Sequence, residues 1–260
     1  GHRRRVGQAP RAGGAARDDR DGRLGSDVTM AAAEPLEGTW PWLQGFTRWI
    51  GTWCFFVGYR LHVRHRERIP RRGPVVVVAN HSAIVDGPLL YGLLGRHSSF
   101  LIKQEMFHGP LGWLLPRLGQ LAVRRGSGDR APLHMAVRVL RADGVVVVFP
   151  EGTRGEGDVA RAHHGATWIA RGGAAPLLPV AIRGTRRPVG VGRRFRPRVD
   201  VLVGEPLAVP PGSGRATLAI ATDEMRTRLA ALVTELDAIR GGTAPGRAGR
   251  KDRDEQFRAR

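Results

Sequence analysis

The chain has 260 residues, 42% of them apolar, and its 42 basic and 23 acidic side chains give a net charge of +19. This length suits one domain with a sizeable core rather than two full domains, and the single cysteine, Cys54, excludes an intramolecular disulfide framework and favours a reducing compartment. The charge predicts affinity for polyanions such as anionic lipid, phosphorylated ligands or nucleic acid, but no nucleic-acid signature or basic stripe with interleaved aromatics is present, so we expect no nucleic-acid partner.

The two ends of the chain have the composition of disordered segments. Residues 1–29 are rich in Gly, Arg and Asp, and residues 241–260 have the same character. The leader lacks the apolar centre of a secretory signal, and Met30 is a candidate native start. We therefore expect a disordered leader over 1–29, an amphipathic membrane-associating helical segment over 30–60, a folded domain over 61–240, and a disordered tail.

Residues 40–59 hold four of the six tryptophans. Spacings of 4, 3, 4 and 3 define one helical stripe of Trp42, Phe46, Trp49, Trp53 and Phe56. Twenty residues nominally span a bilayer, but Gln, Arg, Thr and Gly interrupt this segment, and its tryptophan density is typical of the headgroup zone. We expect a monotopic or peripheral helix at the cytoplasmic face of the cell membrane. The alternatives are a helix packed on the protein's own core and, third, a true span.

From about residue 60 onward, strand and helix patterns alternate. The expected strands are Leu61–Arg66, Val75–Ala79, Ser99–Ile102, Gln120–Val123, Val145–Phe149, Leu177–Ile182 and Val199–Val203. The expected helices are Gly87–Leu94, Leu111–Arg117, Ala131–Arg141, His163–Ala170 and Ala216–Ile239. Both tetravaline runs are continuous, as in strands covered on both faces. The pattern predicts an α/β fold, a mixed, largely parallel sheet flanked by helices, preceded by the amino-terminal membrane-associating segment.

A histidine and an acid follow the first tetravaline strand. His81 comes just after this strand, where ligands of α/β sheets gather, and Asp86 lies five residues further on. An imidazole can take a proton near neutral pH, and a carboxylate that accepts its other N–H fixes the tautomer and stabilises the imidazolium. The two residues are therefore a candidate general base and its orienting acid.

The spacing of this pair sets a structural condition. Five residues on an ideal helix turn about 500°, so His81 and Asp86 would point about 140° apart and can meet only in a loop or a distorted first turn. Gly87 and Pro88 indicate that the regular helix begins after Asp86. The alternative interpretation is an ordinary connection between a strand and a helix, in which Ser82 or Asp86 is only the helix N-cap.

The second tetravaline strand ends in a polar turn. Pro150 stops the strand, and the turn over 151–154 offers a glycine for close backbone approach and an arginine fork for phosphate. Lys103 and Arg125 also follow strands, and at this edge they would complete a cationic pocket. The alternative for the turn over 151–154 is an ordinary polar loop. The alternative for Lys103 and Arg125 is that they are solvated surface cations. The candidate binding residues are Lys103, Arg125, Glu151, Gly152, Thr153 and Arg154.

Four blocks carry a resemblance to a known family. They are NHSAIVD at 80–86, GQLAVRR at 119–125, VFPEGTR at 148–154 and APLLPVAIRG at 175–184. In this order and spacing they resemble the glycerolipid acyltransferases, the PlsC-like 1-acyl-sn-glycerol-3-phosphate acyltransferases and their relatives. Each block alone is modest, but the four together are specific.

The resemblance implies transfer of a fatty acyl group from an acyl-CoA or acyl-carrier protein thioester to the hydroxyl of 1-acyl-glycerol-3-phosphate, giving phosphatidic acid in phospholipid biosynthesis. His81 would deprotonate the hydroxyl and Asp86 would orient the imidazole, with no covalent acyl-enzyme, no metal and no cofactor beyond the thioester co-substrate. The expected partners are anionic membrane lipid, a lysophosphatidate-type acceptor and the acyl thioester donor. The implied glycerol-phosphate pocket consists of Arg125, Glu151, Gly152, Thr153 and Arg154, with help from Lys103.

Departures from the family pattern keep other functions open. Residues 161–165 read RAHHG where the family usually has a basic–basic–Gly step, and Arg124 stands where an acid is common. The acceptor could instead be another lysophospholipid, a glycolipid or glycerol-3-phosphate. Less expected alternatives are a non-catalytic membrane adaptor and a metal-dependent hydrolase. The sequence shows no recognised spacing of zinc ligands, which counts against the hydrolase. That hydrolase would use His81, Asp86, His163 and His164.

Overall fold

The computed structural model describes residues 38–124, 130–150, 164–186, 195–210 and 214–242, apart from the side chains of Cys54 and Phe56. All of these residues belong to a single compact unit. The leader over 1–29 and the tail beyond residue 242, both predicted to be disordered, lie outside the described residues. The following paragraphs concern the described part of the chain.

Within the described ranges, seven strands form one sheet in the order β1-β7-β6-β2-β5-β3-β4. The pairing of β6 with β7 is antiparallel and every other pairing is parallel. This arrangement confirms the predicted α/β fold with a mixed, largely parallel sheet. The strands are β1 (Arg60–Arg64), β2 (Val75–Ala79), β3 (Ser98–Lys103), β4 (Leu121–Val123), β5 (Val145–Val148), β6 (Leu177–Arg183) and β7 (Arg198–Val203).

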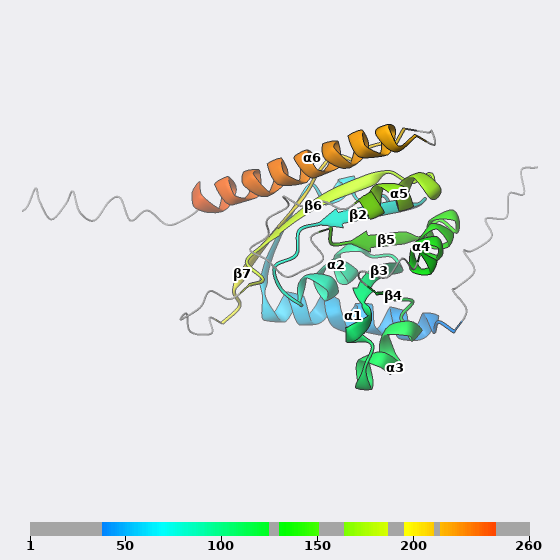
Figure 1. Cartoon of the computed structure of the whole chain (residues 1–260). Helices are drawn as coiled ribbons and strands as arrows, with labels where there is room; N and C mark the ends of the chain where they lie inside the picture. The colour runs from blue at the N-terminus through cyan, green and yellow to red at the C-terminus, as the bar shows by residue number, and fades with distance from the viewer. Residues whose placement is uncertain (1–37, 125–129, 151–163, 187–194, 211–213, 243–260) are drawn as a thin grey trace, which may run out of the picture. The chain divides into compact units, whose positions relative to one another are not determined.

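Helices lie on both sides of the sheet (Figure 1). Helices α4, α5 and α6 contribute to the apolar cluster on one face, and α1 and α2 contribute to the cluster on the other. Two short 3-10 turns, η1 (Arg66–Arg68) and η2 (Gln104–Met106), follow β1 and β3. The helices are α1 (Pro41–Gly58), α2 (Asp86–Leu94), α3 (Gly109–Arg117), α4 (Ala131–Arg141), α5 (His164–Gly172) and α6 (Arg215–Gly242).

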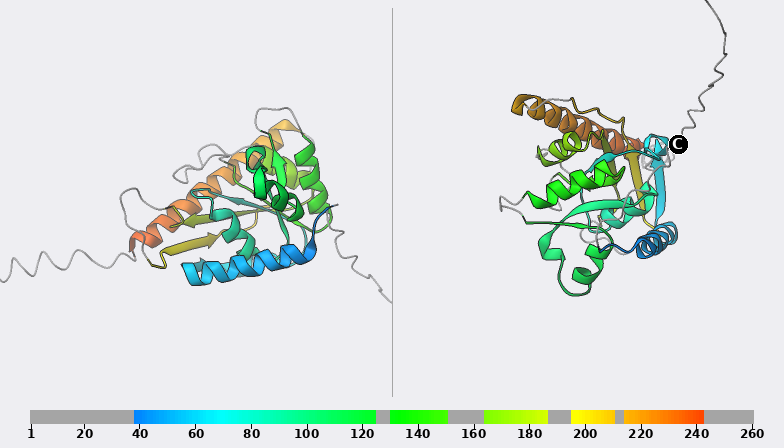
Figure 2. Two further views of the ribbon diagram at one scale, coloured as in Figure 1. Left: turned by 90° about the horizontal axis from the view of Figure 1, so that it is seen from below. Right: turned by 90° about the vertical axis from the view of Figure 1, so that its right-hand side faces the viewer.

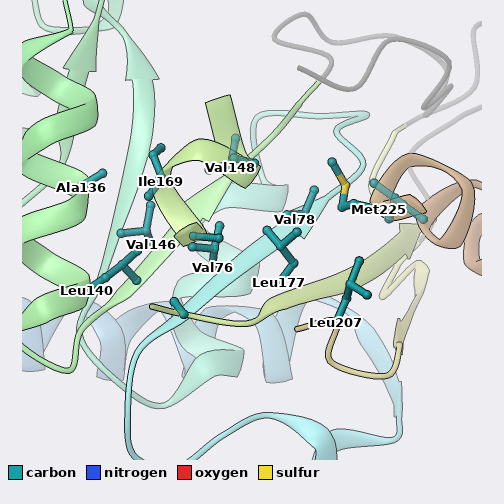
Figure 3. Packing of buried hydrophobic residues seen from close by; sticks show 14 of the residues in the cluster. Val76, Val78, Ala136, Leu140, Val146, Val148, Ile169, Leu177, Leu207 and Met225 are labelled. Carbon is teal, nitrogen blue, oxygen red and sulfur yellow. The ribbon is translucent and has the colours of Figure 1, made fainter. Parts of the chain in front are cut away.

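The two tetravaline strands lie side by side at the centre of the sheet. Strands β2 and β5 pair in parallel, with Val78 opposite Val148. Val76 and Val78 point into the cluster beneath α4, α5 and α6 (Figure 3), whereas Val75 and Val77 point into the cluster on the α2 side. A strand buried on both faces needs apolar residues at every position, which explains why the valines do not alternate with polar residues.

Most element boundaries differ from the predicted ones by one to three residues, and three of them are described here. Strand β1 ends at Arg64 rather than at 66, because His65 adopts a left-handed backbone conformation with φ 56° and starts the turn η1. Helix α2 begins at Asp86, one residue earlier than predicted. Helix α6 continues to Gly242, so the helix includes the first two residues of the predicted tail.

Asn80 extends the sheet by one residue after β2 has ended. Its fully buried side chain donates from Nδ2 to the backbone oxygen of Ile182 at 3.0 Å, and its Oδ1 accepts from the backbone N–H of Ile182 at 2.7 Å. The amide therefore replaces the backbone pairing that β6 would otherwise lose. The main chain at this point is free to leave the sheet.

Replacing Asn80 by alanine is expected to lower the free energy of unfolding by about 2–6 kcal/mol, because two buried backbone groups of Ile182 lose their partners at about 1–3 kcal/mol each. Urea unfolding followed by circular dichroism measures this loss. Ser98→Ala is the matched control, because the Ser98 hydroxyl is buried without a hydrogen-bond partner. An Asn80→Ala protein as stable as the Ser98→Ala protein would contradict the role given to the amide.

Candidate active site

The loop between β2 and α2 brings His81 and Asp86 together. The carboxylate of Asp86 is fully buried, and its Oδ2 accepts from the backbone N–H groups of Ser82 at 2.7 Å and Ala83 at 2.8 Å. These two bonds fold the loop back on the first residue of the helix. The Nδ1 of His81 then lies 3.1 Å from the same Oδ2.

Neither of the capping roles considered for this loop is observed. The N-cap residue of α2 is Val85, which makes no side-chain capping bond, and the Asp86 carboxylate binds N–H groups before the helix rather than within it. The helix can start at Asp86 because Pro88 is its third residue, where a missing N–H leaves no intrahelical bond unmade. The predicted loop geometry is therefore correct, and the predicted helix start is wrong by one residue.

The imidazole of His81 is held from two sides. Its side chain is 17% exposed, and its ring stacks on that of Phe149 with centroids 4.2 Å apart and planes inclined by 25°. A carboxylate only accepts hydrogen bonds, so the contact with Asp86 places a proton on Nδ1 and leaves Nε2 as the acceptor. This is the tautomer that a general base requires.

His81 borders an apolar cavity of about 580 Å³. The walls come from α1, α2, α3 and β3, and burial raises the pKa of Tyr91 in one of these walls. An apolar cavity suits a hydrocarbon chain, because the chain has no hydrogen-bonding groups that the walls would leave without partners. Its transfer from water into the cavity also has a favourable free energy. The main apolar lining residues are Ile84, Phe100, Leu101, Ile102, Leu111, Leu114, Leu115, Leu118 and Phe149.

Comparison with known proteins decides the family. The family model described as Acyltransferase matches residues 60–183, and the crystal structure of the 1-acyl-sn-glycerophosphate acyltransferase PlsC from Thermotoga maritima aligns with a TM-score of 0.60 at 27% identity, over 75% of this chain and 80% of that one. The chain belongs to the glycerolipid acyltransferase family. It is an acyltransferase of the PlsC-like kind.

Curated relatives of this acyltransferase differ in the acceptor that they are named for. A 1-acyl-sn-glycerol-3-phosphate acyltransferase from Bacillus subtilis is 29% identical over 185 residues, which cover 68% of this chain and 90% of that protein. A lyso-ornithine lipid O-acyltransferase from Pseudomonas aeruginosa is 34% identical over 61% of this chain, which spans 62% of its length. The human 1-acyl-sn-glycerol-3-phosphate acyltransferase beta is 31% identical, and the match spans 49% of its length.

The structure places the predicted binding residues only in part. Lys103 is the last residue of β3, is exposed, and lines the cavity that His81 borders. Arg125, Glu151, Gly152, Thr153 and Arg154 lie outside the described residues. Because β2 and β5 are parallel neighbours in register, Pro150 reaches the edge of the sheet from which His81 departs. The chain therefore enters the predicted phosphate turn beside the histidine loop.

Of the two further histidines in the hydrolase alternative, the structure describes only His164, and it lies away from His81. The Nδ1 of His164 lies 3.1 Å from the Thr222 hydroxyl, in the contact between α5 and α6 on the other face of the sheet. His163 lies outside the described residues. Among the described residues, no group of three or more His, Cys, Asp or Glu side chains is arranged to hold a metal ion.

Phe149 is a site residue that sequence reasoning missed. The sequence predicts only that it ends a strand and gives no reason to place it against residue 81. The signal was present in the paired tetravaline strands, because a parallel register of β2 with β5 puts the residues that follow them next to each other. The ring also lies 6.2 Å from that of Phe100, which anchors it in the cavity wall.

Replacing Phe149 by leucine is expected to lower kcat by about three- to tenfold, because a stacked aromatic pair contributes about 0.5–1.5 kcal/mol beyond its buried area. The Michaelis constant for the acceptor should change less, since the ring positions the base rather than the headgroup. Steady-state thiol release measures both constants. Phe149→Tyr keeps the ring and should retain most of kcat; an equal loss in both variants would contradict the positioning role.

Proposed function

We propose that this acyltransferase moves a fatty acyl group from the thioester of acyl-CoA or acyl-carrier protein to the free hydroxyl of 1-acyl-glycerol-3-phosphate, giving phosphatidic acid. The observation that carries this proposal is the position of the His81–Asp86 pair on the border of an apolar cavity. A base beside a hydrocarbon-binding space is what acyl transfer to a lipid hydroxyl requires. The 1-acyl-sn-glycerol-3-phosphate acyltransferases among the relatives add support.

The reaction follows from the tautomer of His81. Nε2 takes the proton of the acceptor hydroxyl as the oxygen attacks the thioester carbonyl carbon, forming the C–O bond. The C–S bond then breaks, and the imidazolium returns its proton to the departing thiolate, so that ester and free thiol are the products. Asp86 stabilises the imidazolium while it exists. The base acts on the acceptor, so no residue of the chain becomes acylated.

The acceptor phosphate would be held by cations at the same edge of the sheet. Lys103 on the cavity rim is the described candidate, and Arg125 together with residues 151–154 would complete the pocket, as the resemblance implies. An arginine fork and a backbone turn with glycine suit the oxygens of a phosphate. The chemistry of the headgroup distinguishes this acceptor from uncharged lipids.

We further propose that the enzyme works at the cytoplasmic face of the cell membrane as a peripheral or monotopic protein. Helix α1 turns Trp42, Phe46, Trp49 and Trp53 outward, each between 52% and 67% exposed. Tryptophans of this density belong to the headgroup zone, where their rings leave water and their N–H groups stay solvated. Among the described helices, none combines the length and the apolar character needed to cross a bilayer.

Thiol release from a long-chain acyl-CoA in the presence of lysophosphatidate tests the proposal, with and without EDTA. Activity that survives chelation and disappears in His81→Ala is the expected result. Loss of activity on chelation would point instead to a metal-dependent hydrolase, and inactivity with retained liposome binding to an adaptor.

A lyso-ornithine lipid is the second candidate acceptor, favoured by the relative from Pseudomonas aeruginosa. The sequence also departs from the common family pattern at Arg124 and at residues 161–165, which fits an acceptor with another headgroup. The same assay with lysophosphatidate, lyso-ornithine lipid, another lysophospholipid and glycerol-3-phosphate as acceptors separates these cases. A kcat/KM highest for lysophosphatidate is expected.

A further inference from the structure

Helix α1 buries Leu43 and Phe55 but turns four large aromatic side chains outward. On the side that faces α2, the backbone oxygen of the buried Gln44 accepts from the Tyr91 hydroxyl at 3.3 Å, and Arg48 donates to the backbone oxygen of Gly95 at 3.2 Å. The close approach of Thr52 to Gly92 lets α1 lie directly on α2. Trp42, Phe46, Trp49 and Trp53 face outward, where a water-exposed helix would carry polar residues.

A second element carries apolar side chains outward on the same side of the sheet. Helix α3 exposes Leu111 and Trp113, with Trp113 51% exposed. Figures 1 and 2 show α1 and α3 together on the side of the sheet away from α6. Neither helix contains an acidic residue, and each contains one arginine.

An arginine joins the two helices. The Arg117 guanidinium carbon lies 5.0 Å from the ring centroid of Trp40 and 4.3 Å from that of Trp113, and the two indoles meet edge to face at 5.8 Å. The backbone N–H of Trp40 donates to the backbone oxygen of Arg117 at 3.0 Å. A guanidinium over two aromatic rings is attracted by the ring electrons, which links the start of α1 to the end of α3. We call Trp40, Trp113 and Arg117 the aromatic clasp.

The cavity lies between the two clasped helices. Its walls include Thr47 and Gly51 from α1 and Leu111 and Leu114 from α3, and the exposed Ile84 stands on its border near His81. A hydrocarbon chain that left a bilayer touching both helices would pass from lipid into the cavity without crossing water. Contact through α1 alone would leave the α3 wall of the cavity in solution.

We propose that α3 is a second membrane-contact element, held by the aromatic clasp in one interfacial surface with α1, and that this surface lies on anionic lipid. The absence of acidic side chains from both helices, on a chain of net charge +19, favours an anionic lipid surface. The inference rests on the proposed function, since a lipid acceptor gives the cavity its reason to face the bilayer. Its partner is the lipid surface itself rather than a protein.

Two single-tryptophan proteins test the contact directly, one retaining Trp113 and one retaining Trp168, with the other five tryptophans changed to phenylalanine. Trp168 is the internal control, because it packs against His134 beneath α4 on the opposite side of the sheet. Each protein is mixed with vesicles of equal parts phosphatidylglycerol and phosphatidylcholine carrying bromine on the acyl chains. We expect the vesicles to quench Trp113 strongly and leave Trp168 unquenched; equal quenching, or none at Trp113 in a vesicle-bound protein, would overturn the proposal.

A partition measurement adds a second arm. Trp113→Ser should weaken binding to the same vesicles by about tenfold, since a partly inserted indole removes a large apolar area from water. The matched control is Ile220→Ser, which removes an exposed apolar side chain from α6 and should bind as the parent does. Equal binding of the Trp113→Ser and parent proteins would count against the proposal.

Acyl transfer to a short-chain, monomeric lysophosphatidate is measured without vesicles. Trp113 is not among the cavity-lining residues, so Trp113→Ser should keep this activity. A parent protein that transfers no acyl group would overturn the proposed function, whereas quenching of Trp113 in that protein would still support the membrane contact of α3.

Discussion

Replacing His81 by alanine is expected to reduce kcat by about 10²–10⁴-fold, the range that a positioned general base contributes. No other described imidazole borders the cavity, so the acceptor hydroxyl would have only water to take its proton. The Michaelis constants should change little, because the ring contacts Asp86 and Phe149 rather than a headgroup pocket. Thiol release at saturating acceptor and donor gives the measurement.

The fold should survive this change. The backbone N–H groups of Ser82 and Ala83 keep Asp86 as their acceptor when the imidazole is gone, so the loop retains its two fixing bonds. His134→Ala is the matched control, because that histidine is exposed on α4 and contacts Trp168. A His81→Ala protein with normal melting behaviour and undiminished kcat would remove His81 from the mechanism.

Replacing Asp86 by asparagine is expected to lower kcat by about 10²–10⁴-fold, because the imidazolium loses the negative charge that stabilises it and the tautomer is no longer fixed. The Michaelis constant for the acceptor should rise far less, since the change affects the base and not the pocket. One amide oxygen can still accept from Ser82 and Ala83, so the loop keeps its shape. The comparison of kcat with KM, together with urea unfolding, is the measurement.

Asp86→Ala supplies the contrast. It removes the acceptor of two loop N–H groups as well as the charge, so it should lower stability in addition to turnover, by about 1–3 kcal/mol for each group left unsatisfied in the interior. Asp86→Asn should approach the parent in stability. If Asp86→Asn raised the acceptor KM and left kcat unchanged, the carboxylate would belong to substrate binding instead.

The sheet was predictable because its central strands are covered on both faces. Continuous valines at 75–78 and 145–148 are typical of such strands, and both strands are confirmed within one residue. The meeting of His81 with Asp86 also followed from the sequence, given a loop between them. The start of α2 at Asp86 did not follow from the sequence, because it depends on Pro88 being tolerated as the third residue of the helix.

The orientation of side chains across elements was harder to predict. The stripe on α1 was visible from its spacing, but the packing of the polar side against α2 depends on Thr52 meeting Gly92, two residues with no sequence rule to connect them. The stacking of Phe149 on His81 and the aromatic clasp likewise depend on tertiary register. The roles of His81 and Asp86, of Lys103 and Arg125, and of residues 151–154 stay predictions until the variants are measured.

The amide of Asn80 has a wider consequence. When a strand leaves a sheet, the backbone N–H and C=O groups of the adjacent strand normally lose their hydrogen-bond partners. A sharp departure of one strand therefore usually disrupts the hydrogen bonding of its neighbour. Here one side chain imitates a missing peptide unit for Ile182. His81, the next residue, can therefore leave the sheet directly. Its imidazole lies one residue beyond a hydrogen-bonded sheet rather than at the tip of a long loop.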